Sequence, residues 1–591
     1  MRLDVFLPIW RKPKGTDAKP GRLRRWLERV GPSWLSSPVR RVVQIGFFAL
    51  FLVLFFWVSW PYGGRHYAET REAREWVDAE IFLALDPLVS LSTAIAGRAW
   101  VWSLGFAAAI LLAGVLVPRG FCGWVCPLGT AIDFFDWLVG RRGARFRVEK
   151  DGPWVHLKYW LLLAVLVAAA CGVLFSGFVA AIPVLTRGFL FATEPAITAV
   201  LRGSHLVPPI NVGQVLSLVL FAAVLGLGLL RPRFWCRYVC PTGALFSVGN
   251  LVRATERKVE SSCIHCNKCI EICPFDAIKA DFTTRTLDCT QCQSCGGVCP
   301  TQSIKFVGRW DVHGLKAEDE PQNHEVALSR RSFLTAGVLG GATALGTSTL
   351  WGAGLGDSSR PLPIRPPGSV PEREFLALCI RCEVCVKACP NNVLHPMGFG
   401  QGLEGLWSPE AVPNWAGCEP SCNNCGQVCP TGAIRALPLE EKRAARMGLA
   451  VVNESTCLPL AGREACQMCV DECRAAGYDA IEFERVRVEV DEQGAPVEGS
   501  GFLAPVVVAD RCVGCGLCQT RCWAINVVEK HLLADTAILV LAGEGREDRL
   551  MGGSYIALRA EERRVREARE DAERKTQGVT DDYLPEFLEH R

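Results

Sequence analysis

The chain has 591 residues and a formal net charge of +3 at pH 7. It is long enough for several domains, and its charge is too small to indicate a nucleic-acid partner. Half of its residues are hydrophobic and 29 are cysteines, and closely spaced cysteines in a long apolar chain favour metal ligation over disulfide bonds.

Four apolar runs near the N-terminus predict membrane-spanning helices. They cover residues 42–60, 99–117, 157–180 and 213–230, and each is near the length that crosses a bilayer. Buried helices of a large soluble protein are the alternative, but four such runs close together favour a membrane domain. The segments around the runs contain eleven, four, six, two and six Lys and Arg residues in chain order. By the positive-inside rule, this alternation places the N-terminus and the region after the fourth run in the cytoplasm.

A repeated motif follows the second and fourth runs. PRGFCGWVCPLG begins at residue 118 and PRFWCRYVCPTG at residue 232, and both lie on the predicted cytoplasmic side. Their four cysteines, here called the membrane cysteine quartet, are Cys122, Cys126, Cys236 and Cys240. Residues four apart share one face of a helix, and the proline after each motif ends or turns that helix. Brought together, the quartet would suit a soft metal or a redox role; otherwise the cysteines pack a tight bend and bind nothing.

Two further cysteine runs have the spacing of bacterial ferredoxins. CIHCNKCIEICP begins at residue 263 and CTQCQSCGGVCP at residue 289. In this motif three cysteines bind one [4Fe–4S] cluster and the fourth reaches the neighbouring cluster. Zinc sites instead pair two separated Cys-x-x-Cys halves. The predicted ligand sets are Cys263, Cys266, Cys269 and Cys299 for one cluster, and Cys289, Cys292, Cys295 and Cys273 for the other.

Four more cysteine motifs follow, all with a three-residue final gap. The second has one extra residue in its first gap, the third has a long first gap, and the last two lack the proline. Their members are Cys379, Cys382, Cys385 and Cys389; Cys418, Cys422, Cys425 and Cys429; Cys457, Cys466, Cys469 and Cys473; and Cys512, Cys515, Cys518 and Cys522. Crossed ligation is expected here too, but the spacing fits both sequential pairing (first with second) and nested pairing (first with fourth). Together the six motifs predict six [4Fe–4S] clusters.

The sequence contains no motif for other substrate chemistry. A P-loop, a dinucleotide-binding fingerprint after a predicted strand and a nucleophile elbow are all missing. No pair of histidines lies within an apolar run to ligate a b-type haem. His156 and His205 flank apolar runs and are candidate contacts for a quinone head group, although interfacial histidines often have no ligand. The sequence therefore favours an electron carrier, and catalytic residues remain unknown.

Residues 329–346 read SRRSFLTAGVLGGATALG, in which two arginines precede a weakly apolar run. This pattern is typical of a bacterial twin-arginine export signal, which normally opens a chain and is then removed. We predict that residues 331–356 form a retained fifth crossing that places the following domain in the periplasm. Cleavage near residues 351–354 is one alternative, and a cytoplasmic protein in which the segment merely packs is another.

The predicted fold class is a multi-domain membrane protein. An α-helical four-helix transmembrane domain and a fifth crossing are joined to α+β bacterial-ferredoxin-like [4Fe–4S] domains. The predicted divisions are a basic cytoplasmic N-terminus at 1–41, a membrane domain at 42–258, a two-cluster ferredoxin domain at 259–308, a linker at 309–330, the signal and fifth crossing at 331–356, a Pro-rich linker at 357–374, a four-cluster ferredoxin domain at 375–545 and a charged helical tail at 546–591.

The motifs in this order resemble two known families. Residues 42 to about 308 resemble the NapH-type membrane ferredoxins, which have four helices, two Cys-x3-Cys-Pro motifs and a two-cluster ferredoxin. Residues 329 to about 535 resemble the NapG-type exported ferredoxins, and ARMGLAVV at residues 445–452 strengthens this match. These proteins are usually separate subunits, so the resemblance implies a fusion.

The resemblance implies a quinol dehydrogenase module in the bacterial inner membrane, the quinol-oxidising part of an oxidoreductase complex. Such a module takes electrons from the membrane quinone pool, with a bound quinone as an expected ligand. It passes them to a periplasmic reductase or c-type cytochrome, typically of a periplasmic nitrate reductase system. Related pairs serve the maturation of methylamine dehydrogenase, so an electron donor that matures or maintains a periplasmic metalloenzyme is the alternative.

The predicted topology leaves a gap in the electron path. Residues 1–330 would lie in the cytoplasm or the membrane, and residues 357–591 in the periplasm. Roughly 30 Å of hydrocarbon would separate the two sets of clusters, which is too far for a useful direct electron jump. A mobile quinone or the membrane cysteine quartet is expected to bridge it.

Overall fold

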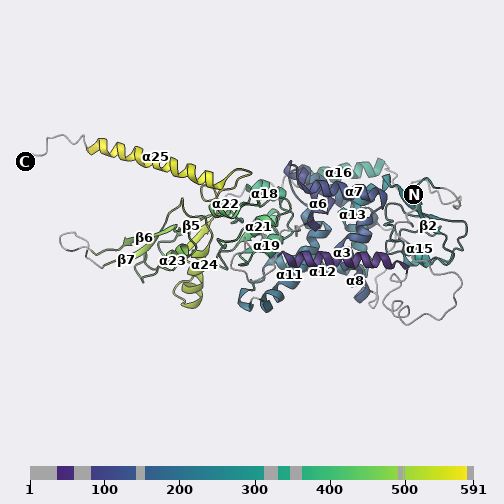
Figure 1. Cartoon of the computed structure of the whole chain (residues 1–591), viewed down its shortest axis with the longest axis horizontal. Coiled ribbons are helices and arrows are strands. Elements are labelled where there is room, and N and C mark those ends of the chain that lie inside the picture. Colours follow the sequence, from purple (N-terminus) through teal and green to yellow (C-terminus); the bar gives the residue numbers. More distant parts are fainter. Residues whose placement is uncertain are drawn as a thin grey trace, which may run out of the picture.

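A computed structural model describes residues 36–58, 81–140, 153–201, 203–311, 330–346, 362–489, 491, 497 and 500–581. The molecule is elongated, with a helical domain in the middle and ferredoxin-like regions at both of its ends (Figure 1). The first ferredoxin region, residues 255–308, occupies one end, and residues 362–541 extend from the other. Most of the predicted basic N-terminus and of the predicted 309–330 linker lies outside the described residues.

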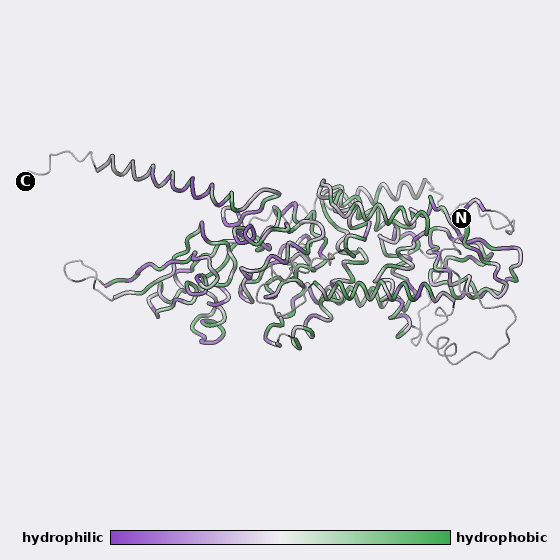
Figure 2. The backbone as a smooth tube through the Cα atoms, in the orientation of Figure 1, coloured by the Kyte–Doolittle hydropathy of each residue, from purple (hydrophilic) through white to green (hydrophobic). Residues whose placement is uncertain are grey.

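Four helices connect the two ends of the helical domain. They are α3 (Pro38–Trp57), α7 (Ser103–Leu116), α9 (Leu157–Ala170) and α12 (Val212–Gly226). Shorter elements between them are α5 (Ile81–Ala84), α6 (Pro87–Gly97), η4 (Pro153–His156), α10 (Ser176–Val179) and η5 (Ser204–Leu206). The backbone of this domain is largely hydrophobic in Figure 2.

Among the described residues, three helices are long and apolar enough to cross a membrane. They are α3, α11 (Ala181–Leu201) and the span Val212–Leu229, which continues α12 through the short helix η6 (Leu227–Leu229). The predicted second and third runs correspond to the shorter helices α7 and α9, with 14 residues each. The chain thus contains apolar helices of membrane length, but the predicted count of four crossings plus a fifth stays a prediction.

The third predicted run is not one helix, and a helix follows it where the sequence predicted a loop. α9 ends at Ala170, and the chain turns at Gly172, whose φ of 84° is in the left-handed region that favours glycine. After α10, residues 181–201 form α11 instead of the predicted loop. Polar side chains interrupt the hydropathy of α11, and another part of the chain satisfies them, as described below.

The two cysteine repeats have the same local structure. The π-helical turns η2 (Phe121–Val125) and η7 (Trp235–Val239) each carry the first cysteine, and the second cysteine follows directly. Cys126 and Cys240 have nearly identical backbone angles, with φ of −58° and −61° and ψ of 116° and 114°. The next proline then begins a new helix, α8 (Pro127–Phe135) or α13 (Pro241–Gly249). As predicted, the proline marks the end of each cysteine turn.

The first ferredoxin region is built on one antiparallel strand pair. β1 (Thr255–Val259) pairs with β2 (Ile304–Gly308), and Thr255 lies opposite Gly308. Two short helices, α14 (Lys268–Ile272) and α15 (Ser294–Val298), lie between the strands in sequence. The region therefore begins four residues before the predicted boundary at residue 259.

The second ferredoxin region has two units with separate cores. The docked unit, residues 362–438, shares one continuous hydrophobic core with the helical domain. Its elements are α18 (Glu372–Leu378), α19 (Val384–Ala388), α20 (Gly402–Gly405), α21 (Asn424–Gln427) and the antiparallel pair β3 (Leu394–Pro396) and β4 (Pro409–Ala411). The distal unit, residues 449–541, has its own core. It contains α23 (Met468–Ala475), α24 (Leu517–Cys522) and two antiparallel pairs, β5 (Leu449–Val452) with β8 (Ile538–Leu541) and β6 (Ile481–Val486) with β7 (Phe502–Val507).

Two further helices connect or extend these regions. α16 (Arg330–Gly346) packs against α9 along the helical domain (Figure 1). It covers the first part of the predicted fifth crossing, and residues 347–356 lie outside the described residues. α25 (Tyr555–Asp581) is the predicted charged helical tail, and it projects away from the distal unit with hydrophilic residues along its described length (Figure 2).

The docked unit is held on the broken end of α9 by two buried arginines. Arg381 donates a hydrogen bond to the carbonyl of Leu174 at 2.8 Å. Arg187 of α11 donates to the carbonyls of Gly177 at 2.7 Å and Arg381 at 2.6 Å. Irregular backbone at membrane depth is tolerated only where protein groups pair with it. Each half of the chain therefore satisfies polar groups of the other.

Two more contacts extend this interface. Lys387 of α19 forms an ion pair with Glu194 of α11 at 2.6 Å. The indole of Trp407 donates to the Gly213 carbonyl at 2.7 Å, and its ring lies 4.2 Å from the Arg187 guanidinium carbon. The polar residues that make α11 look like a loop in sequence thus bind the docked unit.

We predict that Arg187→Met loosens the docked unit. The variant leaves two buried carbonyls without their charged donor, which typically costs about 2–3 kcal/mol per lost bond to a charged group. Hydrogen exchange followed by mass spectrometry should speed up at residues 174–178 and 379–383. Arg373→Met, at an exposed position of α18, is the matched control. Equal exchange in both variants would contradict the interface.

Candidate functional site

The first ferredoxin region places its eight cysteines around two cavities. Cys263, Cys266, Cys269 and Cys299 line one of them, and Cys273, Cys289, Cys292 and Cys295 line the other. Each cavity thus takes three cysteines from one motif and the fourth from the other. This is the crossed arrangement that the spacing predicts.

The docked unit shows the same exchange between its two motifs. Burial raises the pKa of the Cys379 thiol to about 11 against the effect of Arg381, and the charge of Cys429 from the second motif is part of this rise. Burial also raises the pKa of Cys422 to about 12, and Cys389 from the first motif is close enough to add to the shift. The first motif therefore pairs with the second.

The distal unit pairs the third motif with the fourth. Cys473, Cys512, Cys515 and Cys518 line one cavity. On the other side of the unit, burial raises the pKa of Cys469 to about 12, and the charges of Cys466, Cys457 and Cys522 add to this effect. Of the two pairings that the sequence left open, the structure has the sequential one.

Left-handed residues recur at the same two places in four of the six motifs. The positions lie two and four residues after the leading cysteine, and their φ angles fall between 47° and 81°. They are His265 and Asn267, Gln291 and Gln293, Arg381 and Glu383, and Gly514 and Gly516. A short helix begins directly after the second position in each motif. These turns bend the Cys-x-x-Cys loop around the cavity, and only the fourth C-terminal motif uses glycine for them.

Backbone amides donate hydrogen bonds to the last cysteine of three motifs, the one that joins the set of the partner motif. The amides of Ala277, Ile434 and Ala480 donate to the sulfurs of Cys273, Cys429 and Cys473 at 3.3, 3.4 and 3.3 Å. Amide donors of this kind favour the thiolate form that binds iron and adjust the reduction potential of a cluster.

The cysteines are grouped in sets of four that line small cavities. Among the described residues, no three His, Cys, Asp or Glu side chains converge on one metal ion. A tetrahedral zinc site would bring four sulfurs within about 2.3 Å of a common centre. Cysteine sets arranged around a cavity, with two sets per ferredoxin unit, instead match cubane clusters.

The membrane cysteine quartet comes together in the structure. Cys126 and Cys240 are close enough to Cys122 and Cys236 to interact electrostatically, and Cys126, Cys236 and Cys240 lie in the same buried core. Repeats that are more than a hundred residues apart thus contribute equally to one thiol-rich centre. The structure thus brings the four thiols into one buried region, and a metal or redox role for them stays a prediction.

Two buried arginines join the repeats around this centre. Arg119 of the first repeat donates to the carbonyl of Cys236 at 3.1 Å, and Arg233 of the second donates to the carbonyl of Cys122 at 3.0 Å. Arg119 is also paired with Asp288 at 3.4 Å and Arg233 with Asp133 at 2.7 Å. The contacts are related by the internal repeat, and they place two positive charges beside the four thiols.

The membrane cysteine quartet lies next to the first ferredoxin region. A side chain at Gly123 would come within 3.0 Å of Thr290, which follows the cluster residue Cys289. Lys158, at the start of α9, bonds Asp288 at 2.8 Å. The quartet and the set containing Cys289 are therefore neighbours through direct packing.

The two histidines considered as quinone contacts lie in short 3-10 helical turns. His156 ends η4 and precedes α9, and His205 lies in η5 beside Gly203. Neither lines the membrane-side cavity of about 760 Å³ described below. A quinone role for them stays a prediction.

Three family models match the chain. A 4Fe-4S binding domain matches residues 98–145 and 214–258, which contain the two membrane motifs. A 4Fe-4S dicluster domain matches residues 378–438, and a further 4Fe-4S binding domain matches residues 257–279. [4Fe–4S] binding is thus supported for both ferredoxin regions, and the number of six clusters stays a prediction.

The chain is 34% identical over 216 residues to the methylamine utilization ferredoxin-type protein MauM of Methylophilus methylotrophus, covering 35% of this chain and 82% of that protein. It is 34% identical over 209 residues to the ferredoxin-type protein NapG of Escherichia coli, covering 34% and 83%. The chain belongs to the MauM and NapG family of ferredoxin-type proteins. It is also 28% identical over 194 residues to the methylamine utilization ferredoxin-type protein MauN of Methylorubrum extorquens, covering 32% of this chain and 59% of that protein. No solved structure matches the chain.

Sequence reasoning missed the residues that organise this MauM/NapG-type protein around its cysteines. Arg119 and Arg233 follow the proline at the start of each repeat, so the shared Pro-Arg was a usable signal. Their partners Asp133 and Asp288 carry no such signal, because the ion pairs join segments far apart in sequence.

We predict that Cys469→Ala and Cys522→Ala remove the same cluster. Each single variant should lose about four iron atoms per chain, and the double variant should lose no more. Cys385→Ala combined with Cys522→Ala should lose about eight, because the structure assigns these residues to different sets. Iron and sulfide analysis with EPR checks both pairs. The reverse pattern would indicate nested pairing and contradict the sequential arrangement.

Proposed function

We propose that this chain is a membrane-bound electron carrier that takes electrons from membrane quinol and delivers them to a periplasmic redox partner. The observation that carries the proposal is a helical domain that contains the clustered membrane cysteine quartet and has a ferredoxin-like region at each of its ends (Figure 1). Its ferredoxin-type relatives support electron transfer.

The order of the cysteine sets supports a single electron path. The set containing Cys289 packs beside the quartet through Thr290. At the other end of α9, Arg381 lies within the Cys379 motif and bonds the Leu174 carbonyl. α9 rises about 21 Å over its 14 residues, which is shorter than a bilayer core. In this proposal the quartet serves as an intermediate step between the two sets.

The surface of the helical domain supports its insertion in a membrane. Val53, Leu112 and Val219 are 60%, 69% and 59% exposed on α3, α7 and α12. Soluble proteins rarely expose apolar side chains along several adjacent helices. In this proposal these side chains face lipid, and α16, which begins with the twin arginines Arg330 and Arg331, is the first part of the retained fifth crossing.

The two halves of the chain correspond in this proposal to two subunits joined in one polypeptide. The helical domain and first ferredoxin region form the half that resembles the NapH-type membrane ferredoxins. The docked and distal units form the NapG-type and MauM-type half, with four of six clusters. The buried contacts of Arg187 and Trp407 keep the two halves together.

The chain's own residues position the clusters and their electrons. [4Fe–4S] clusters would supply one-electron transfer when bound by the 24 predicted ligands. Arg119 and Arg233 place positive charge beside the quartet, which favours an added electron there. Burial in the shared core keeps water away from the path.

The terminal partner is the less defined part of the proposal. Relatives of the MauM and NapG types match with the same identity of 34%. Methylamine utilization in the MauM name favours the second candidate, a donor for maturation or maintenance of a periplasmic metalloenzyme. Purification with the partner from the native host distinguishes this from a reductase or cytochrome of a nitrate-reducing system.

We predict that replacing Cys126 and Cys240 by serine blocks electron passage between the two ends. Excess quinol should then reduce only the clusters of the first ferredoxin region, about a third of the EPR spins that dithionite produces. In the unchanged protein quinol should reduce clusters of both regions. Freeze-quench EPR of purified protein in nanodiscs measures the ratio.

The matched control is Cys171→Ser, a cysteine at the end of α9 that lies outside the quartet. It should behave as the unchanged protein. Equal spin counts with quinol in the double variant and in this control would contradict a path through the quartet.

A further inference from the structure

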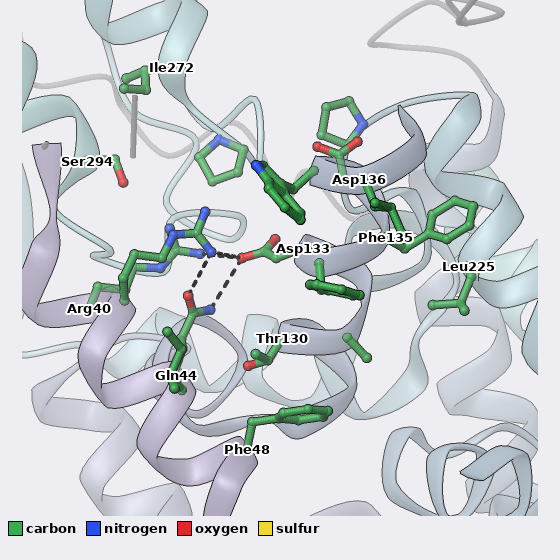
Figure 3. Close-up of a pocket in the computed structure, with 18 of the residues that line it drawn as sticks. Arg40, Gln44, Phe48, Thr130, Asp133, Phe135, Asp136, Leu225, Ile272 and Ser294 are labelled. Carbon is green, nitrogen blue, oxygen red and sulfur yellow. Dashed lines mark hydrogen bonds and ion pairs between the residues drawn. The ribbon is translucent and has the colours of Figure 1, made fainter. Parts of the chain in front are cut away.

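A cavity of about 760 Å³ lies between the helical domain and the first ferredoxin region. Its walls come from α3, α8, α11, α12 and the segment that carries Cys273. Figure 3 shows Arg40, Gln44 and Asp133 meeting at one side of this space, with Phe48, Phe135 and other apolar side chains around the rest.

The polar side of the cavity is a fixed network around Asp133. Arg233 binds this carboxylate with two nitrogens, at 2.7 and 2.9 Å, and Arg41 binds it at 2.7 Å. Arg40 lies 3.4 Å from it, and Gln44 donates to it at 3.4 Å. Three guanidinium groups therefore surround the Asp133 carboxylate, while Asp136 and Glu271 are the other charged residues of the wall.

The remaining walls are apolar and lie at the membrane side of the domain. Phe48, Phe189 and Phe221 come from three different helices, and all three line the cavity. At its edge Ile45 and Phe134 are 48% and 60% exposed. Since α3 and α12 are among the helices that are apolar and long enough to cross a membrane, this edge faces the lipid side, through which an apolar tail can enter.

The cavity reaches the cluster-binding residues directly. Cys273 and Ser294 are part of its wall, and Ser294 accepts a bond from the cluster residue Cys292. The buried guanidinium of Arg40 faces both the cavity and Cys292, with which it interacts electrostatically. A ligand in this space would lie beside the cluster set of Cys273, Cys289, Cys292 and Cys295.

We propose that this cavity is the site where membrane quinol is oxidised. Its shape and walls fit a compact polar ring with a long apolar tail, and its contact with a cluster ligand fits a redox-active occupant over a structural lipid. The proposal rests on the proposed function above and adds a position to it. Electrons enter at the first ferredoxin region, on the side opposite the docked and distal units.

The reaction balances with the [4Fe–4S] cluster that the set containing Cys273 would hold as its electron acceptor. Oxidation of one quinol breaks two O–H bonds and yields a quinone, two protons and two electrons. The electrons would leave one at a time through that set, and the positive charges of Arg40 and Arg41, which line the cavity, favour the deprotonated quinol oxygen. The protons leave to water at the exposed edge of the cavity.

The test fills the cavity without changing its polar network or any cysteine. Ile45→Trp places an indole at the edge of the cavity on α3. Val53→Trp is the matched control, since Val53 is exposed on the same helix and lies outside the cavity. We expect Ile45→Trp to raise the KM for a short-chain quinol at least ten-fold, while Val53→Trp leaves it within two-fold.

A second measurement is independent of turnover. A photoreactive azidoquinone should label peptides containing residues 40–48 or 130–138 in the unchanged protein, and Ile45→Trp should abolish this labelling. Excess phospholipid should leave the labelling in place if the site is specific for quinone. Labelling elsewhere, or loss of labelling with phospholipid, overturns the assignment of this cavity.

The outcomes separate this proposal from the proposed function. If quinol reduces the clusters equally well in Ile45→Trp and in the control, the proposed function holds and the quinol site lies elsewhere. If dithionite reduces the clusters of the unchanged protein but quinol does not, both the proposed quinol oxidation and this site are overturned.

Discussion

The arrangement of the whole protein depends on the point where α9 stops. Its 14 residues rise about 21 Å, which is less than the roughly 30 Å of a bilayer core. The backbone beyond it is irregular and needs hydrogen-bond partners that lipid does not offer. Arg381 and Arg187 supply them to Leu174 and Gly177. A predicted cluster-binding loop thereby contacts the helical domain. The short α9 leaves room for the docked unit, and the docked unit supplies hydrogen bonds to the backbone after α9.

The second organising feature is the internal repeat that carries the membrane cysteine quartet, at the end of the helical domain that contacts the first ferredoxin region. Each repeat alone offers two cysteines on a π-helical turn, which is too few for a cluster. Arg119 and Arg233 reach across to the carbonyls of the other repeat and fix the four thiols as one set. The same arginines bind Asp288 and Asp133. They thereby connect the quartet with the first ferredoxin region and with the cavity beside it.

Local patterns in the sequence predicted the parts of the structure that depend on short spacing. Crossed ligation between the motifs at residues 263 and 289 follows from cysteine spacing, and the turn at each membrane motif follows from its proline. The prediction of a loop where α11 lies was wrong. Arg187 and Glu194 look unsuited to an apolar helix in the sequence, but their partners come from residues some two hundred positions later. The third run was wrong as one helix for the same reason.

Other features depend on contacts that no local pattern records. Sequential pairing of the last four motifs is set by how the docked and distal units fold into separate cores. Even so, Gly514 and Gly516 marked the left-handed positions in one motif. Three other motifs place non-glycine residues at the same left-handed positions, where the turn is strained and the surrounding structure must offset that cost.

The central claim is that electrons cross the membrane within this one chain. The most direct measurement uses the unchanged protein in sealed vesicles, with quinol in the membrane and ferricyanide confined to the side of the docked and distal units. Protease access to α25 establishes the orientation. The account predicts ferricyanide reduction well above the rate in protein-free vesicles. Reduction only when ferricyanide is on the side of the first ferredoxin region would contradict it.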